Sequence, residues 1–131
     1  MKAHEKPRIL LVMPEAAREE FVRAAGPGGA EWVAVENCGE AYEALAAPDG
    51  FAVVVSEVML SDGNWYCVLN AMVRKGCEAK LIVTSDDGRN PPDVTSYGAL
   101  AFLPRPLDPD GERTFRTAID GRQGRGAAHA G

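Results

Sequence analysis

Residues 52–63, with the sequence AVVVSEVMLSDG, decide the fold of this chain. The stretch opens on an unbroken apolar run, reaches the carboxylate of Glu57, and ends in the turn sequence Ser61-Asp62-Gly63. An apolar run bounded by turn residues is typical of a strand that is buried on both faces of a parallel sheet. In open α/β sheets, ligands bind and chemistry takes place at the carboxyl ends of such strands. We therefore expect Glu57 to lie at a functional site.

The same kind of apolar run recurs along the chain, separated by segments with helical periodicity. We expect strands at residues 9–12, 31–36, 51–56, 80–84 and 100–103. We expect helices at residues 15–25, 39–47 and 65–75, with a last helix that follows Asp108-Pro109. Asn64 and Gly76 are suited to cap the third helix at its two ends. Between the last two strands, only residues 93–97 can form a turn of helix, because Pro91-Pro92 precedes them.

Strand and helix alternate five times with short connections, and this alternation predicts the fold class. We expect an α/β three-layer sandwich, in which a parallel five-stranded sheet carries helices on both faces through right-handed crossovers. The domain is expected over residues 8–120, after a lead-in of residues 1–7. Residues 121–131 lack periodicity and are expected to form a flexible tail.

Composition excludes several classes of function. The formal charge is 14 − 19 = −5, which argues against nucleic acid or an anionic membrane as the main partner. The apolar runs are too short to span a membrane, and the N-terminus has no signal-peptide pattern. Three cysteines (Cys38, Cys67 and Cys77) form neither a CxxC motif nor a zinc pattern. We expect reduced thiols in a cytoplasmic protein.

Four sequence segments together resemble the landmarks of response-regulator receiver domains, over about residues 8–119. They are ILLV at 9–12, SEVMLSDG at 56–63, LIVTS at 81–85 and GALAFLPRPLD at 98–108. The resemblance implies the flavodoxin-like (βα)5 fold with strand order 2-1-3-4-5. It also implies a part in two-component signal transduction or a phosphorelay.

The resemblance assigns family roles to five positions of this chain. Glu57 stands where receivers carry the phosphoacceptor aspartate, and Thr84 matches the hydroxyl residue that ends the fourth strand. Arg105 replaces the essential lysine, and Pro106 follows it, at a peptide bond that is usually cis in the family. Phe102 matches the aromatic residue of the fifth strand that reports activation in many receivers.

The departures from the family pattern concern the metal site. Receivers carry an acidic pair after the first strand, and this pair binds Mg²⁺ together with the phosphoacceptor. Here the two positions are Met13 and Pro14, whose side chains cannot bind a hard cation. Glu15 comes one residue too late and is expected to begin a helix. We therefore expect the magnesium site to be lost and the protein to use no cofactor.

Two interpretations of Glu57 follow from its chemistry. In the first, Glu57 forms a buried, metal-free polar network with Arg105 and Thr84, since buried charges are usually paired. In some receivers a glutamate at this position mimics the phosphorylated state, so that the same network would hold an activated arrangement. In the second, Asp86 and Asp87 join Asp62 in an unorthodox metal site. An ordinary solvated acidic loop is the favoured interpretation of those aspartates.

The aromatic and hydroxyl residues near the pocket also have structural alternatives. Trp65 and Tyr66 either form a lid or an interface anchor, or they are half-buried aromatics that cover the start of a helix. For Phe102 we favour a core position. For Thr84, the alternative to a place in the polar network is a strand-end hydroxyl that is hydrogen-bonded to the backbone.

These observations predict a receiver-like signalling protein that is not an enzyme and that works by phosphorylation-independent protein contacts. Its partners would be a histidine-kinase-like or output protein, bound near the fifth strand, the last helix and the reduced fourth helix. We expect a monomer or a weak homodimer. The alternatives are a working phosphoreceiver with an unorthodox acceptor or metal site, and an enzyme on the same fold. No Ser-His-Asp set, Cys–His pair or Gly-rich phosphate loop supports an enzyme.

Overall fold

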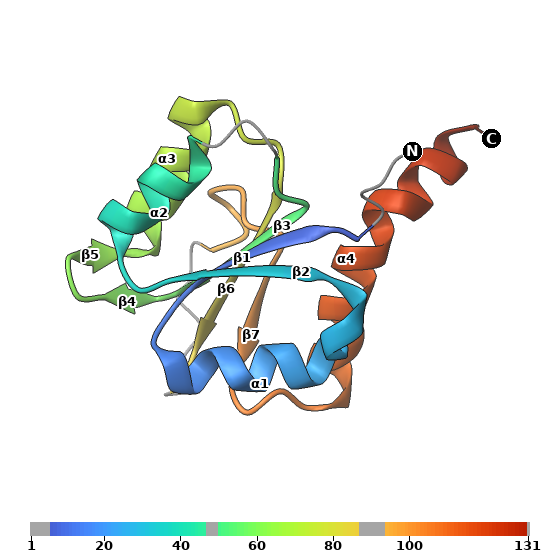
Figure 1. The fold of residues 1–131 in the computed structure, drawn as a ribbon, viewed down its shortest axis with the longest axis horizontal. Helices are drawn as coiled ribbons and strands as arrows, with labels where there is room; N and C mark the ends of the chain where they lie inside the picture. Colours follow the sequence, from blue (N-terminus) through green and yellow to red (C-terminus); the bar gives the residue numbers. More distant parts are fainter. Residues whose placement is uncertain (1–5, 47–49, 87–93, 131) are drawn as a thin grey trace.

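The computed structural model describes residues 6–46, 50–86 and 94–130, and in this part of the chain five parallel strands form one sheet (Figure 1). The strand order is β2-β1-β3-β6-β7. Because β4 and β5 form a separate hairpin, β6 and β7 are the fourth and fifth strands of the sheet, and the order is the predicted 2-1-3-4-5. The five strands are β1 (Arg8–Val12), β2 (Glu31–Val35), β3 (Val53–Glu57), β6 (Lys80–Ser85) and β7 (Ala101–Pro104). The predicted parallel sheet is confirmed.

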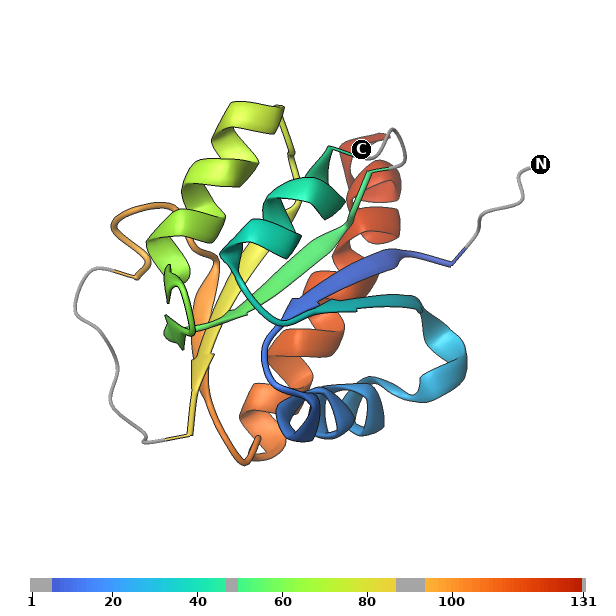
Figure 2. The same ribbon diagram turned by 60° about the vertical axis from the view of Figure 1, so that its left-hand side comes forward.

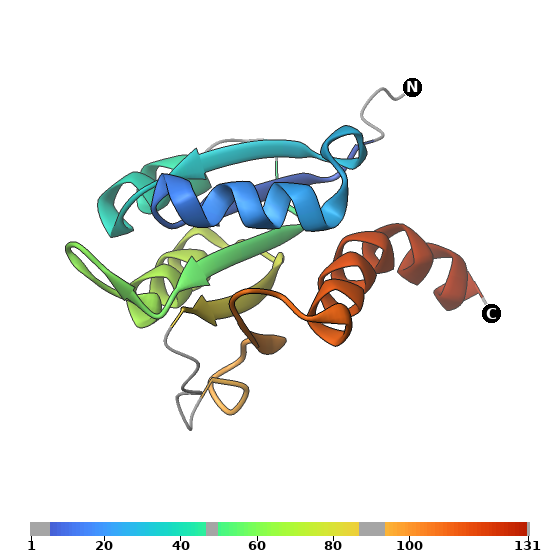
Figure 3. The same cartoon turned by 90° about the horizontal axis from the view of Figure 1, so that it is seen from below.

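Helices cover both faces of the sheet, which gives the expected three layers (Figures 2 and 3). On one face, α1 (Glu15–Ala25) contacts α4 (Pro109–Ala130), and on the other α2 (Cys38–Leu45) contacts α3 (Trp65–Lys75). A short 3-10 helix (Pro27–Gly29) follows α1. The α/β class and the flavodoxin-like topology are therefore correct.

Alternation along β1 shows why one strand supports two cores. Ile9 and Leu11 belong to the cluster beneath α1 and α4, while Leu10 and Val12 belong to the cluster beneath α2 and α3. All four are essentially inaccessible to solvent, because successive side chains of a strand point to opposite faces. Burial on both faces requires a continuous apolar run, which is the pattern in the sequence.

The helix boundaries follow the capping residues in the sequence. Asn64 Oδ1 accepts a hydrogen bond of 2.9 Å from the backbone N–H of Tyr66, and Gly76 ends α3 in the left-handed conformation at φ 69°. The carboxylate of Asp108 likewise accepts 2.7 Å from the N–H of Gly111 at the start of α4. These predicted caps are confirmed.

Three local features differ from the expectation. The turn at residues 61–62 joins a small antiparallel hairpin of β4 (Met59–Leu60) and β5 (Gly63–Asn64). Residues 94–98 form turns rather than helix, and residues 87–93, which include Asp87 and Pro91-Pro92, lie outside the described part of the chain. The helix α4 continues to Ala130, past the start of the expected tail, since no proline follows Pro109 to end it.

The expectation of three reduced cysteines is wrong for two of them. Cys38 and Cys67 form a disulfide with a Cα–Cα distance of 6.1 Å, and Cys77 is not part of it. The bridged residues are 29 positions apart, and their sequence spacing does not reveal that the first turns of α2 and α3 lie together.

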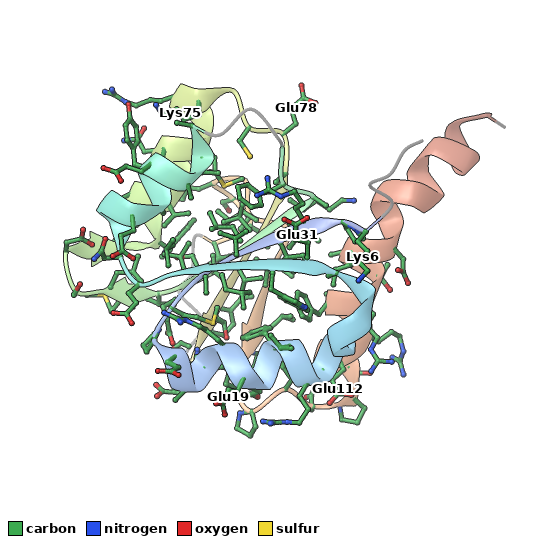
Figure 4. The ribbon with its side chains drawn as sticks, in the orientation of Figure 1. Lys6, Glu19, Glu31, Lys75, Glu78 and Glu112 are labelled. Carbon is green, nitrogen blue, oxygen red and sulfur yellow. A yellow bond between two sulfur atoms is a disulfide. The ribbon has the colours of Figure 1, made fainter. Side chains whose placement is uncertain are left out.

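Most charged side chains lie on the outside of the three layers, whereas Glu57 is buried. Those labelled in Figure 4, among them Glu19, Glu31 and Lys75, are at the periphery, whereas carbon-rich side chains fill the space between helices and sheet. Within the described residues, no helix combines the length and apolar character that crossing a bilayer requires.

Candidate functional site

The carboxyl ends of three neighbouring strands bring the candidate site together. Glu57 is the last residue of β3 and pairs in register with Thr84 of β6. Arg105 directly follows β7, and its backbone N–H donates 3.0 Å to the carbonyl of Ser85. The parallel sheet thus places the Glu57 carboxylate and the Arg105 guanidinium, which are 48 residues apart in the sequence (105 − 57 = 48), at the carboxyl edge of the sheet.

Arg105 and Glu57 form a buried ion pair between Nη1 and Oε2. Only 7% of the arginine side chain and 11% of the glutamate side chain are exposed, so neither charge is well solvated. The predicted pairing of these two residues is therefore what the structure shows.

Two further carboxylates surround the same guanidinium. Glu20 Oε1 lies 3.9 Å from Arg105 Nε, and Asp86 Oδ2 lies 3.7 Å from Arg105 Nη2. Asp86 is 81% exposed, whereas Glu20 is 23% exposed. With Glu57 included, three carboxylates meet one guanidinium, a formal sum of 1 − 3 = −2. A site with this charge repels an incoming anion.

Glu20 is the functional residue that the sequence analysis missed. Its Oε2 accepts 2.6 Å from the backbone N–H of Leu107, so that one side chain of α1 holds both Arg105 and the segment after β7. The available signal is its spacing, because Glu20 follows the buried Ala17 by three positions and therefore borders the helix face that packs on the sheet.

Thr84 is not part of the polar network that we expected. Its hydroxyl is fully buried and donates 2.6 Å to the carbonyl of Leu103, on the neighbouring strand β7. The structural alternative, a strand-end hydroxyl bonded to backbone, is the observed arrangement. Thr84 pairs in register with Leu103, so the carbonyl of that residue is within reach of the short threonine side chain.

The carboxyl end of β1 contributes no acid at the two positions of the family pair. Met13 is fully buried in the core beneath α1, and Pro14 precedes α1 as its N-cap residue. Glu15 begins the helix and is exposed, as expected. Met13 and Pro14 therefore play structural roles.

Asp62 belongs to the turn between β4 and β5, and its side chain lies against the first residues of α2. Its two carboxylate oxygens accept from the backbone N–H groups of Cys38 (2.8 Å) and Gly39 (3.1 Å). The hydrogen bond from Cys38 is the main cause that lowers the pKa of Asp62 below its usual value; desolvation opposes it, and the hydrogen bond from Gly39 adds to the lowering. The Asp62 carboxylate therefore serves as a cap for the first turn of α2. Asp87 lies outside the described residues, in which no group of three or more potential ligands could hold a metal ion.

The ion pair forms one wall of an open pocket of about 420 Å³. Glu57, Arg105, Glu20 and Asp86 supply its charged groups. The remaining wall comes from small residues of α1 and from two prolines, which are Ala16, Ala17, Pro14 and Pro106. The Arg105–Pro106 peptide bond is cis, as the resemblance implied.

The aromatic residues at the start of α3 and near β7 divide into a buried and an exposed set. Trp65 is 2% exposed and stacks on Tyr66, with ring centroids 4.4 Å apart. Tyr66 is 42% exposed and meets Tyr97 edge-to-face at 5.5 Å. Phe102 is partly buried and packs against the core beneath α2 and α3, as favoured. Of the two predicted interface residues, the structure leaves only Tyr66 on the surface.

The structure is similar to several solved receiver domains. A signal receiver domain from Vibrio parahaemolyticus superposes with a TM-score of 0.77 at 18% identity, covering 96% of this chain and 98% of that one. A CheY-like receiver domain from Methanospirillum hungatei JF-1 gives 0.71 at 20% identity, with coverages of 92% and 99%. The receiver domain of the Francisella response regulator 1452 gives 0.70 at 13% identity, with coverages of 92% and 98%.

These likenesses define the fold. The chain has the flavodoxin-like fold of response-regulator receiver domains over nearly its whole length. No protein-family model and no curated protein sequence matches the chain.

Proposed function

We propose that this chain is a receiver-like signalling module of the two-component type that acts through protein contacts and takes up no phosphoryl group at Glu57. The observation that carries the proposal is the buried Glu57–Arg105 pair, which occupies the position of the phosphoacceptor and of the family lysine. The solved structures to which the chain is similar are response-regulator receiver domains, and this similarity supports a role in signalling rather than in enzymatic turnover.

Three features of the site argue against phosphoryl transfer. Transfer requires positive charge around the phosphoryl oxygens, but Arg105 is already surrounded by three carboxylates. Met13 and Pro14 supply no ligand for Mg²⁺, which prefers oxygen atoms in octahedral geometry. The longer side chain of Glu57 places its carboxylate against the guanidinium, where a phosphoryl group would have to fit. The proposed module therefore uses no metal cofactor.

The proposed contact surface lies beside the edge strand β7. Tyr66, Tyr97 and Leu100 expose 42%, 55% and 46% of their surfaces, and the two tyrosine rings touch. Aromatic side chains contribute strongly to protein interfaces because they bury a large area at low entropic cost. The proposed partner is a histidine-kinase-like or output protein.

Treatment with a small phosphodonor tests the proposed loss of chemistry. We expect the intact mass of the protein to stay unchanged after incubation with acetyl phosphate and Mg²⁺, because the acceptor is paired and the metal ligands are missing.

Glu57→Gln is the matched control, since it removes the carboxylate at nearly constant volume. If the natural chain gains one phosphoryl group and Glu57→Gln does not, Glu57 is a working acceptor and the proposal is wrong. A gain in both proteins would place the acceptor elsewhere and would equally contradict a phosphorylation-independent module.

A further inference from the structure

We propose that Cys38 and Cys67 form a reversible redox site, in which a small disulfide such as oxidised glutathione closes the bridge and the corresponding thiol opens it. The inference concerns the face of α2 and α3 and does not depend on the proposed function of the Glu57 site.

The bridge connects the first turns of two helices. Cys38 is the first residue of α2 and Cys67 the third residue of α3, and these helices pack side by side (Figures 1 and 2). Gly63 of the hairpin leaves the space for the bridge, because a Cβ atom there would stand 3.2 Å from the sulfur of Cys38 and 3.3 Å from that of Cys67. Cys38 Sγ also lies 3.7 Å from the carbonyl oxygen of Asn64, so the end of the hairpin packs against the same sulfur.

Both cysteines lie in the first turn of a helix and at intermediate depth. Cys38 and Cys67 are only partly buried as residues, which is compatible with exchange with a small thiol. Cysteines in the first turn of a helix are stabilised as thiolates, which makes a disulfide easier to reduce and faster to exchange. Neutral Asn64 caps the helix of Cys67, whereas the carboxylate of Asp62 already occupies the N-terminus of α2, and we therefore assign the first attack to Cys67.

Contacts other than the bridge also hold α2 and α3 in place, as a switch requires. The first turn of α2 is also held by Asn37, which accepts 2.9 Å from the N–H of Glu40, and by Asp62. The core beneath α2 and α3 includes Ala41, Val68 and Met72, all buried. Opening the bridge therefore leaves the helices packed, with Asp62 of the hairpin still bonded to the backbone of the first turn of α2.

The reaction balances as a thiol–disulfide exchange. The Cys67 thiolate attacks one sulfur of oxidised glutathione, the glutathione S–S bond breaks, and one glutathione thiolate leaves. The Cys38 thiolate then attacks the Cys67 sulfur of the mixed disulfide and displaces the second glutathione. Two protein thiols thus lose two electrons and two protons, and oxidised glutathione gains them as two thiols.

Equilibration in glutathione buffers tests the proposal. The Cys77→Ser variant, which keeps only the two cysteines of the bridge, is incubated over a range of ratios of reduced to oxidised glutathione, quenched with acid and alkylated. Intact mass should show a change from no alkylated thiol to two as the buffer becomes more reducing. The melting temperature should fall by about 10 °C on reduction, because the disulfide no longer closes a loop that restricts the unfolded chain.

Cys38→Ser and Cys67→Ser are the matched controls. Each should melt at the temperature of the reduced protein and should not respond to reductant. Two outcomes overturn the proposal. A bridge that stays closed in every glutathione buffer is a permanent structural disulfide, and two thiols that stay reduced in every buffer form no bridge at all.

Discussion

Replacing Arg105 by methionine lowers the free energy of unfolding by about 3 kcal/mol, because the buried carboxylate of Glu57 loses its ion pair with the guanidinium. The side chains of the pair are only 7% and 11% exposed, so water cannot compensate for the lost charge. The carboxylate of Glu20 also loses a cation that lies 3.9 Å away. Urea denaturation at neutral pH, followed by circular dichroism, measures the effect.

The double variant Glu57→Leu, Arg105→Met distinguishes a broken pair from a general loss of packing. We expect it to unfold within about 1 kcal/mol of the natural protein, since a buried ion pair and an apolar pair of similar volume are often equally stable. The exposed pair Arg113–Asp110, at 2.8 Å, provides the matched control, and Arg113→Met should cost only a few tenths of a kcal/mol, about what exposed pairs contribute. A double variant as unstable as Arg105→Met would contradict the pairing.

Trp65→Ala lowers the free energy of unfolding by about 4 kcal/mol, which is typical of removing a buried tryptophan from a core. Trp65 is 2% exposed, and its backbone N–H donates 3.0 Å to the carbonyl of Val58, just after the Glu57 strand. Its removal leaves a cavity beneath the first turn of α3. Thermal and urea denaturation of the variant measure the loss.

Tyr66→Ala is the neighbouring control, because Tyr66 is 42% exposed and should cost less than about 1 kcal/mol. If Trp65→Ala were as stable as the natural protein, Trp65 would be a surface residue, and our assignment of it to the core would be wrong.

The fold could be predicted because its information is local. Each buried strand, such as residues 53–57, is a continuous apolar run, and each helix carries its own caps, such as Asn64 and Gly76. The parallel register then brings Glu57 and Arg105 to one edge, so that this pair could also be inferred before the structure was seen.

The rest of the site depends on long-range packing that local pattern does not report. Glu20 reaches the pocket only because α1 passes beneath the cis Arg105–Pro106 segment. Asp62 caps a helix that begins 24 residues earlier in the sequence, and Cys38 meets Cys67 through the same hairpin. Thr84 has two possible hydroxyl partners in the sequence pattern, and only the structure distinguishes the backbone of Leu103 from the Glu57 carboxylate.

A crystal structure of the protein grown with millimolar Mg²⁺ and beryllofluoride tests most directly whether the buried Glu57–Arg105 pair excludes metal and phosphoryl chemistry from the site. We expect Arg105 Nη1 to remain paired with Glu57 Oε2, with no metal ion and no beryllofluoride in the pocket between α1 and the strand ends. A hydrated Mg²⁺ bound to Glu57, with Arg105 turned away from the carboxylate, would contradict the proposed loss of phosphoryl chemistry.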